Sequence, residues 1–299
     1  MTTIATSPEQ AAPVDLEFHH VSNRERFMQA FGKNKVAQLG LVIVLVLSLS
    51  ALLAPSIAPY DPIAPDYAAV LQPPTTSHWL GTDELGRDIF TRLLYGARIS
   101  MVIGFVGEGV SLAIGVLLGS ISGWYGGWVD DLIMRITDVF FAIPSLMFLI
   151  VVVSIVKPGP VSIFLALGFI SWPSETRMMR SQVISIKNMD YIMAARAIGV
   201  STPRMLMQHI LPNAVAPMIV LGTLGIAGVI QSEAILSFLG LGIQIPTPSW
   251  GTMVNTGQNY IFNAAWYAIF PGLAIMVTVL GFNFLGDGLR DALDPTRYQ

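Results

Sequence analysis

The sequence predicts an all-α polytopic membrane protein with six transmembrane helices. Only 12% of its 299 residues are charged, whereas soluble domains average about 25%. Hydrophobic residues make up 53% of the chain, and the mean hydropathy is +0.64. Six separate stretches are long and apolar enough to cross a bilayer, which takes about 20 residues per helix. These properties exclude a water-soluble enzyme, a nucleic-acid-binding protein and a disordered chain.

The N-terminal tail, residues 1–35, is polar and holds four Lys and Arg residues. It lacks the short apolar core and small-residue cleavage site of a signal peptide. We expect residues 1–20 to be disordered and residues Phe27 to Phe31 to form a short interfacial helix. The next stretch, 36–58, contains no charged residue and predicts the first transmembrane helix.

Residues 59–98 predict a long external loop that ends in a polar run. Loops of this length are usually functional or disordered. The candidate residues of this run are Thr82, Asp83, Gly86, Arg87 and Asp88. A later external loop adds Trp250. They face an external partner or guard an entrance, or they simply pack the two loops together. Asp83 and Arg87 are four residues apart and can also pair with each other.

The remaining five spans are expected within residues 99–286, followed by a cytoplasmic tail at 287–299. Their approximate limits are 99–123, 132–156, 161–178, 212–232 and 262–286. The second span carries small residues at every fourth position, namely Ser111, Gly115, Gly119 and Gly123. Such a stripe lets another helix approach closely. The neighbouring helix can belong to this subunit or to a partner.

The distribution of basic residues predicts the orientation in the membrane. With the N-terminus inside, 12 of the 16 Lys and Arg residues fall in cytoplasmic segments. Basic residues accumulate on the cytoplasmic side of membrane proteins. Both termini are therefore expected in the cytoplasm, which agrees with an even number of spans.

The sequence offers no catalytic or metal-binding motif. It contains no cysteine, and none of its four histidines lies deep in an apolar span. It also lacks a Walker A loop and a His-Glu-x-x-His helix. We therefore expect no catalytic residue, metal or cofactor on this chain. If ATP powers it, another subunit must bind the nucleotide.

Glu108 is the one clear ionisable residue at depth in a predicted span. Intramembrane ionisable residues are functional candidates by default. One interpretation is a group that lines a pathway for a cationic group or a proton. The alternative is a structural glutamate bonded to a neighbouring helix. Arg135 and Asp138, three residues apart near the start of the third span, are expected to form a local ion pair.

Residues 185–212 predict a cytoplasmic loop of two short helices. Ala194, Ala195 and Arg196 favour a helix, and Gly199 is suited to end it because glycine tolerates a positive φ. Pro203 suits the first turn of the next helix. From these residues alone, the loop either inserts its small-residue surface into a partner or lies on the membrane.

The sequence of this loop resembles the EAA loop of ABC importer permeases. Ala194 and Ala195, Gly199, and Ile210 with Pro212 carry the likeness, although Met193 stands where the family usually has glutamate. The resemblance implies that Ala194, Ala195, Arg196 and Gly199 form the coupling helix and its stop. In that family the helix docks into a groove of the ATPase and transmits its closure to the membrane spans.

Further motifs resemble the dipeptide, oligopeptide and nickel branch of that family, over residues 35–299. They are His78–Asp88, Leu93–Ser100, Ser232–Gly242, Pro246–Met253 and Gly286–Pro295. The resemblance implies a C-type permease subunit in a prokaryotic plasma membrane. It implies a homologous B-type permease, two ATPase subunits that bind ATP and Mg, an external substrate-binding protein and a peptide substrate.

Two alternatives to peptide import remain at this stage. A permease of the same branch can import nickel, glutathione, haem or an opine. A proton-coupled secondary carrier would work without ATPase subunits.

Overall fold

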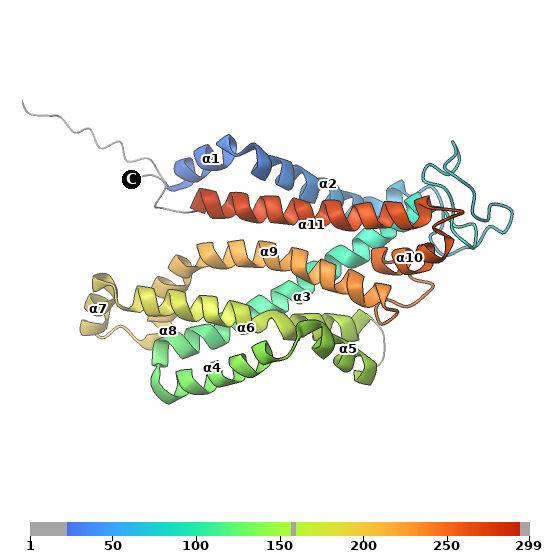
Figure 1. Ribbon diagram of the computed structural model, residues 1–299. Coiled ribbons are helices and arrows are strands. Elements are labelled where there is room, and N and C mark those ends of the chain that lie inside the picture. The colour runs from blue at the N-terminus through green and yellow to red at the C-terminus, as the bar shows by residue number, and fades with distance from the viewer. Residues whose placement is uncertain (1–22, 157–159, 294–299) are drawn as a thin grey trace, which may run out of the picture.

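The computed structural model describes residues 23–156 and 160–293 (Figure 1). Within these ranges the regular structure is helical, apart from one isolated β-bridge between Thr82 and Asp88. The prediction of an all-α fold is therefore confirmed for the described residues. The tail expected to be disordered, residues 1–20, lies outside them.

Two helices open the described chain. Helix α1 (Asn23–Lys33) includes the short helix expected near Phe27. Helix α2 (Lys35–Ile57) is the first predicted span. Asn34 separates the two helices, and its side chain accepts hydrogen bonds from the first free N–H groups of α2.

Helix α3 (Ile89–Tyr125) begins about ten residues before the predicted second span, so the expected external loop of 59–98 is too long. Asp88 caps the helix by accepting a hydrogen bond from the N–H of Thr91. The first turns of the helix contain Arg92 and Arg98, and these charges lower the local hydropathy. The hydropathy criterion therefore did not assign these turns to the span. At 1.5 Å per residue, α3 is about 55 Å long and exceeds the thickness of the bilayer core.

The third predicted span, 132–156, is not one continuous helix. Helix α4 (Gly127–Ala142) and helix α5 (Ser145–Val156) meet at an angle of 89°. Pro144 lies at the break. The helix cannot continue through it, because its ring is bulky and it has no backbone N–H. Hydropathy cannot detect this bend, since both halves are apolar.

Helix α6 (Pro160–Lys187) continues nine residues past the predicted end of the fourth span. The segment between it and the next span forms α7 (Asp190–Ala197), α8 (Thr202–Met205) and one π-helical turn (Leu206–Ile210). Helix α9 (Leu211–Phe238) follows directly.

The last part of the chain forms α10 (Trp250–Gly257), a 3₁₀ turn (Gln258–Tyr260) and α11 (Trp266–Leu293). Figure 1 shows α10 beside the loop that follows α2, at one end of the molecule. Helix α7 lies at the opposite end, together with α1 and the last turns of α11. The two ends of the described chain thus lie on the same side.

Four helical segments of the described chain are individually long and apolar enough to cross a membrane. They are α2, α3, the continuous stretch Thr202–Phe238 and α11. The bent pair of α4 and α5 adds a fifth. Helix α6 does not meet the same criterion, and its second half carries several charged side chains. The sixth span remains a prediction, placed on α6.

The stripe of small residues on α3 packs within this subunit, against α6. A Cβ atom added to Gly115 would lie 2.2 Å from the Cβ of Glu175, and one on Gly119 would lie 2.6 Å from the carbonyl oxygen of Thr176. The hydroxyl of Ser111 donates to the carbonyl of Gly168 at 2.8 Å. These contacts hold the α3 and α6 backbones close together at the centre of the fold.

Candidate functional site

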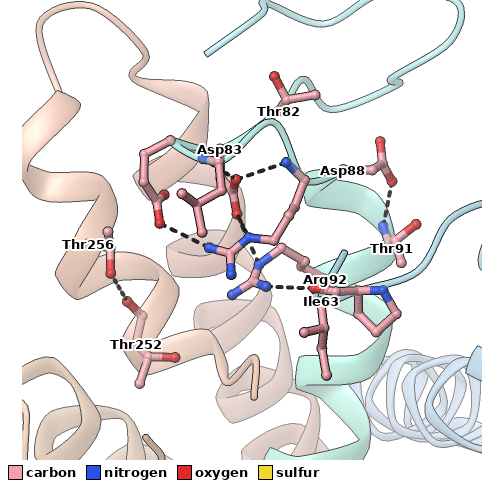
Figure 2. A network of polar contacts seen from close by, with 12 residues as sticks. Ile63, Thr82, Asp83, Asp88, Thr91, Arg92, Thr252 and Thr256 are labelled. Carbon is pink, nitrogen blue, oxygen red and sulfur yellow. Dashed lines mark hydrogen bonds and ion pairs between the residues drawn. The ribbon is translucent and has the colours of Figure 1, made fainter. Parts of the chain in front are cut away.

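The loop before α3 is organised around Asp83. Its Oδ2 accepts a hydrogen bond from Nε of Arg87 at 2.7 Å and lies 3.3 Å from Nε of Arg92. Its Oδ1 accepts the backbone N–H groups of Leu85 and Arg87, each at 2.9 Å. Figure 2 shows Asp83, Arg92 and Asp88 together where the loop enters α3. Asp83 and Arg87 therefore pair, as their spacing allows.

The other candidates of this region are also buried. Thr82 donates to the carbonyl of Ala69 and Asp88 caps α3, while the carboxylate of Asp88 lies 3.1 Å from the His78 ring. A Cβ atom on Gly86, whose φ is +76°, would overlap a backbone oxygen. Trp250 of α10 donates to the carbonyl of Leu93 in α3. All six predicted residues of this region are buried, so each is covered by other parts of the chain.

A partner at this end of the molecule would instead meet the exposed residues around the network. Trp79 is 64% and Tyr67 is 74% exposed. Asp61 is exposed too, and the N–H groups of Ile63 and Ala64 donate to its carboxylate and lower its pKa. This carboxylate is therefore charged at neutral pH.

Helix α7 ends in a Schellman motif. The N–H of Gly199 donates to the carbonyl of Arg196 at 3.0 Å, and the N–H of Val200 donates to that of Ala195 at 3.1 Å. Gly199 has a φ of +83°, which glycine adopts without strain. The expected helix stop is therefore present at the expected residue.

Helix α7 is attached to the body of the protein by a small number of contacts. Ile192 is fully buried among side chains of α6 and the α8–α9 segment, and Ala195 is half-buried against the same cluster. The guanidinium of Arg196 lies 4.9 Å from the centre of the Trp124 ring, at the end of α3. The rest of the helix is exposed, including Ala194, and the side chain of Ile198 just after it is 83% exposed.

Glu108 lines a cavity of about 520 Å³ that opens to the surface at the exposed residues Phe141 and Ile143. The residue is 1% exposed, and neither of its carboxylate oxygens has a hydrogen-bond partner within the described chain. Its carboxylate sits against Gly225 of α9, where an added Cβ atom would lie 2.3 Å from Cδ of Glu108. Leaving a buried polar group without a partner costs about 1–3 kcal/mol, and more for a charge. This glutamate therefore lacks the partner that a structural role would supply.

A second carboxylate, missed in the sequence, lines the same cavity. Glu175 of α6 is 3% exposed, and its Oε2 is also without a partner. It lies within the predicted fourth span, 161–178, but only three residues before its end, so it was not counted as an ionisable residue at depth. Its position follows from the close contact of its Cβ with Gly115, which only the structure shows.

Buried Glu233 of α9 shows what a satisfied glutamate looks like in this fold. Its two oxygens accept hydrogen bonds from Ser237 at 2.6 Å and Ser100 at 3.2 Å.

The expected Arg135–Asp138 pair is wrong, because Asp138 pairs with Arg177 of α6 at 2.5 Å. Packing of α4 against α6 makes the inter-helix partner available.

Comparison with known proteins identifies the family. Residues 115–297 match the family described as binding-protein-dependent transport system inner membrane component. The chain belongs to this family. Residues 22–74 also match the N-terminal TM domain of oligopeptide transport permease C.

Individual relatives of this permease family cover nearly the whole chain. The dipeptide transport system permease protein DppC of Alkalihalophilus pseudofirmus is 43% identical over 293 residues, which cover 98% of this chain and 96% of that protein. The oligopeptide transport system permease protein OppC of Bacillus subtilis is 42% identical over 90% of this chain and 88% of its own length.

A solved structure shares the fold of the permease. The inward-facing MetNI methionine ABC transporter aligns with a TM-score of 0.56 at 18% identity, over 67% of this chain and 96% of that one. The resemblance to ABC importer permeases is thus confirmed at the level of family and fold. A membrane component of this family is a transport subunit and not itself the ATPase, which agrees with the expectation of a non-enzyme.

Proposed function

We propose that this permease translocates di- or oligopeptides across the plasma membrane as one subunit of an ABC importer. A homologous B-type permease completes the pathway, two ATPase subunits bind ATP and Mg, and an external binding protein delivers the peptide. The observation that carries the proposal is the separation of three features along one bundle. An exposed short helix lies at one end, a rigid polar loop lies at the other, and a cavity with two carboxylates lies between them.

The end that carries α7 is proposed to be cytoplasmic. The two described ends of the chain lie at the same end of the molecule as α7 (Figure 1), and most of the basic residues belong to segments assigned to this side. The loop between α2 and α3, with α10, then faces outward. This orientation places residues 1–35 and 287–299 in the cytoplasm and gives α6 the role of the sixth span.

Helix α7 is proposed to be the coupling helix. Ala194, Arg196 and the following Ile198 are exposed and available to an ATPase groove, while Ile192 and Ala195 hold the helix to the membrane bundle. The Schellman motif at Gly199 fixes where the helix ends, which makes it a compact element that can be pushed as a unit.

Movement of α7 has a direct route to the cavity. Arg196 stacks on Trp124 at the end of α3, and the same helix carries Glu108 near its centre. Ile192 contacts the cluster that joins α6 to α9, and these two helices also line the cavity. In the proposed cycle, ATP-driven closure of the ATPases displaces α7 and opens the cavity outward. Hydrolysis returns it to the inward-facing state.

The external end is proposed to receive the binding protein. The buried network around Asp83 keeps the loop rigid, and the exposed side chains of Trp79, Tyr67 and Asp61 form the accessible surface. Under this proposal Thr82, Gly86, Arg87, Asp88 and Trp250 support the docking surface and do not contact the partner themselves.

Reconstitution of the complete complex tests this function. Proteoliposomes that contain this chain, its B-type partner, the ATPases and the binding protein should accumulate radiolabelled dipeptide only when ATP is supplied. Ala194→Asp should abolish uptake and weaken co-purification of the ATPase, because it places a charge in the proposed groove. Ala195→Asp should have the same effect by another route, because it places a charge against the apolar cluster that holds α7 to the bundle. Gln29→Asp adds a charge to the exposed surface of α1 and should leave uptake unchanged.

Three outcomes would contradict the proposal. Uptake by this chain alone, driven by a proton gradient, would indicate a secondary carrier. ATP-dependent uptake of nickel or haem, without peptide uptake, would assign another substrate. Normal uptake by both alanine variants would remove the coupling function from α7.

A further inference from the structure

The cavity between α3, α6 and α9 contains a charge pattern that the fold does not explain. Two glutamates from different helices, Glu108 and Glu175, line it. Among the described residues that line the cavity there is no Lys, Arg or His. Other buried acids of the described chain, such as Asp83 and Glu233, are surrounded by donors. Four serines, Ser145, Ser171, Ser174 and Ser232, also line the cavity, so its polar groups are hydroxyls and two acids. A cavity at depth whose ionisable groups are all acids is suited to a ligand that brings a positive charge.

The two carboxylates are given room by glycines. Gly225 lies against the carboxylate of Glu108, and Gly115 lies against the side chain of Glu175. Glu108 is 19 residues from the start of α3, or about 28 Å along the helix axis, so it lies far from both ends of the bundle. The site is therefore central in the proposed pathway, away from both docking faces.

The unsatisfied acceptors match one class of cation. Three carboxylate oxygens are without partners, Oε1 and Oε2 of Glu108 and Oε2 of Glu175. A primary ammonium group carries three N–H donors and no acceptor. Two phenylalanines, Phe140 and Phe141, also line the cavity. The Phe141 ring already has the guanidinium of Arg177 over it, at 4.1 Å from the ring centre.

A metal ion is a poorer match for these residues. Within the described chain, no group of three or more His, Cys, Asp or Glu side chains could hold one. Binding by two carboxylates alone would leave most positions of a divalent cation to water. The volume of about 520 Å³ also exceeds what an ion needs and falls in the range of small-molecule sites.

We propose that this cavity binds the N-terminal ammonium group of the peptide in transit, with Glu108 and Glu175 as its acceptors. The proposal rests on the peptide-import function and adds a recognition site within the permease itself. Apart from the two glutamates, the lining residues are serines, glycines and apolar residues, and no further charged side chain selects among the peptide side chains. Such a site would favour a free amino terminus over a blocked one, whatever the peptide sequence.

Binding of two matched probes to the purified complex in nanodiscs tests the site. The probes are radiolabelled dialanine and its des-amino analogue propionyl-alanine, which has nearly the same shape without the ammonium group. Equilibrium dialysis is run without the binding protein, in nucleotide-free and ATP-trapped states. The wild-type complex should bind dialanine at least tenfold more tightly than propionyl-alanine. Glu108→Gln or Glu175→Gln should reduce that ratio to below threefold, with propionyl-alanine binding unchanged.

A second pair of variants separates the site from folding defects. Gly225→Ala keeps both charges but places a Cβ atom 2.3 Å from Cδ of Glu108, so it should displace the carboxylate and also lower the preference. Gly109→Ala adds the same methyl group one residue from Glu108, where no atom lies within 4 Å, and should retain the full preference.

Three results would overturn the proposal. They are equal binding of the two probes by the wild type, a tenfold preference that persists in Glu108→Gln, and no binding of either probe in both nucleotide states. In each case dipeptide uptake by wild-type proteoliposomes is measured in parallel. If uptake persists, the proposed peptide-import function is retained and only the proposed ammonium-binding site is rejected.

Discussion

Asp83 is the residue whose replacement should most weaken the external loop. Its carboxylate is fully buried and contacts Arg87 and Arg92, which are each only 3% exposed. Asp83→Ala would leave both guanidinium groups buried without this counter-charge, although Glu84 would still pair with Arg87. It would also remove the acceptor for two backbone N–H groups.

The expected loss is large because one partner of a buried pair is removed. Breaking such a pair costs about 3–5 kcal/mol. This corresponds to a fall in Tm of roughly 6–20 °C, at about 2–4 °C per kcal/mol for domains of roughly 150–250 residues. Asp83→Asn should lose less, since the amide oxygen still accepts the two backbone N–H groups.

Tryptophan fluorescence during thermal unfolding of the purified complex measures the effect. Trp266 donates to the carbonyl of Thr82 and Trp250 packs beside the same loop, so both report on it. The control is Asp61→Asn, at an exposed acid of the same loop, and it should not shift Tm measurably. The double variant Asp83→Ala/Arg87→Met should recover at least half of the lost stability. A fall below 3 °C for Asp83→Ala, or a double variant as unstable as the single one, would refute the assignment of the network as a buried ion pair.

Three further substitutions test other parts of the fold. Gly115→Ala should destabilise the complex by about 1–3 kcal/mol through overpacking against α6. The control Gly109→Ala adds a methyl group in open space on the same helix and should not destabilise it. Equal Tm values for the two variants would contradict the packing of α3 on α6. Gly199→Ala should cost about 1–2 kcal/mol because of its positive φ. It should expose the α7–α8 connection to protease, and an unchanged digestion rate would argue against a rigid helix end. Arg196→Gln removes a cation–π contact worth about 0.5–1 kcal/mol. It should lower the peptide imported per ATP hydrolysed, whereas a constant ratio would exclude this contact from coupling.

Hydropathy and spacing predicted the helices that are long, uninterrupted apolar stretches, such as α2 and α11. Helix α2 lies within one residue of the expected limits, whereas α11 begins four residues and ends seven residues later than expected. The helix stop at Gly199 was also predictable, because its conformation depends on the local backbone alone.

Features that depend on contacts between distant segments were not predictable from the same patterns. Asp138 has a nearby basic residue in sequence but pairs with Arg177 on another helix. The first turns of α3 are stabilised by the loop around Asp83, although their arginines resemble loop residues. Glu108 and Glu175 line the same cavity because α3 packs on α6, and no single sequence periodicity predicts that packing.

The break between α4 and α5 indicates which side of the permease faces the aqueous route. At Ile143 and Pro144 the backbone leaves the helical path at an angle of 89°, and these residues with Ser145 border the cavity. Interrupted main chain at membrane depth is tolerated only against protein or water, since lipid offers no hydrogen-bond partners. Under the proposed function, we therefore expect this corner to turn away from lipid, toward the cavity and the companion permease. Crosslinks from position 143 should reach that protein and not acyl chains.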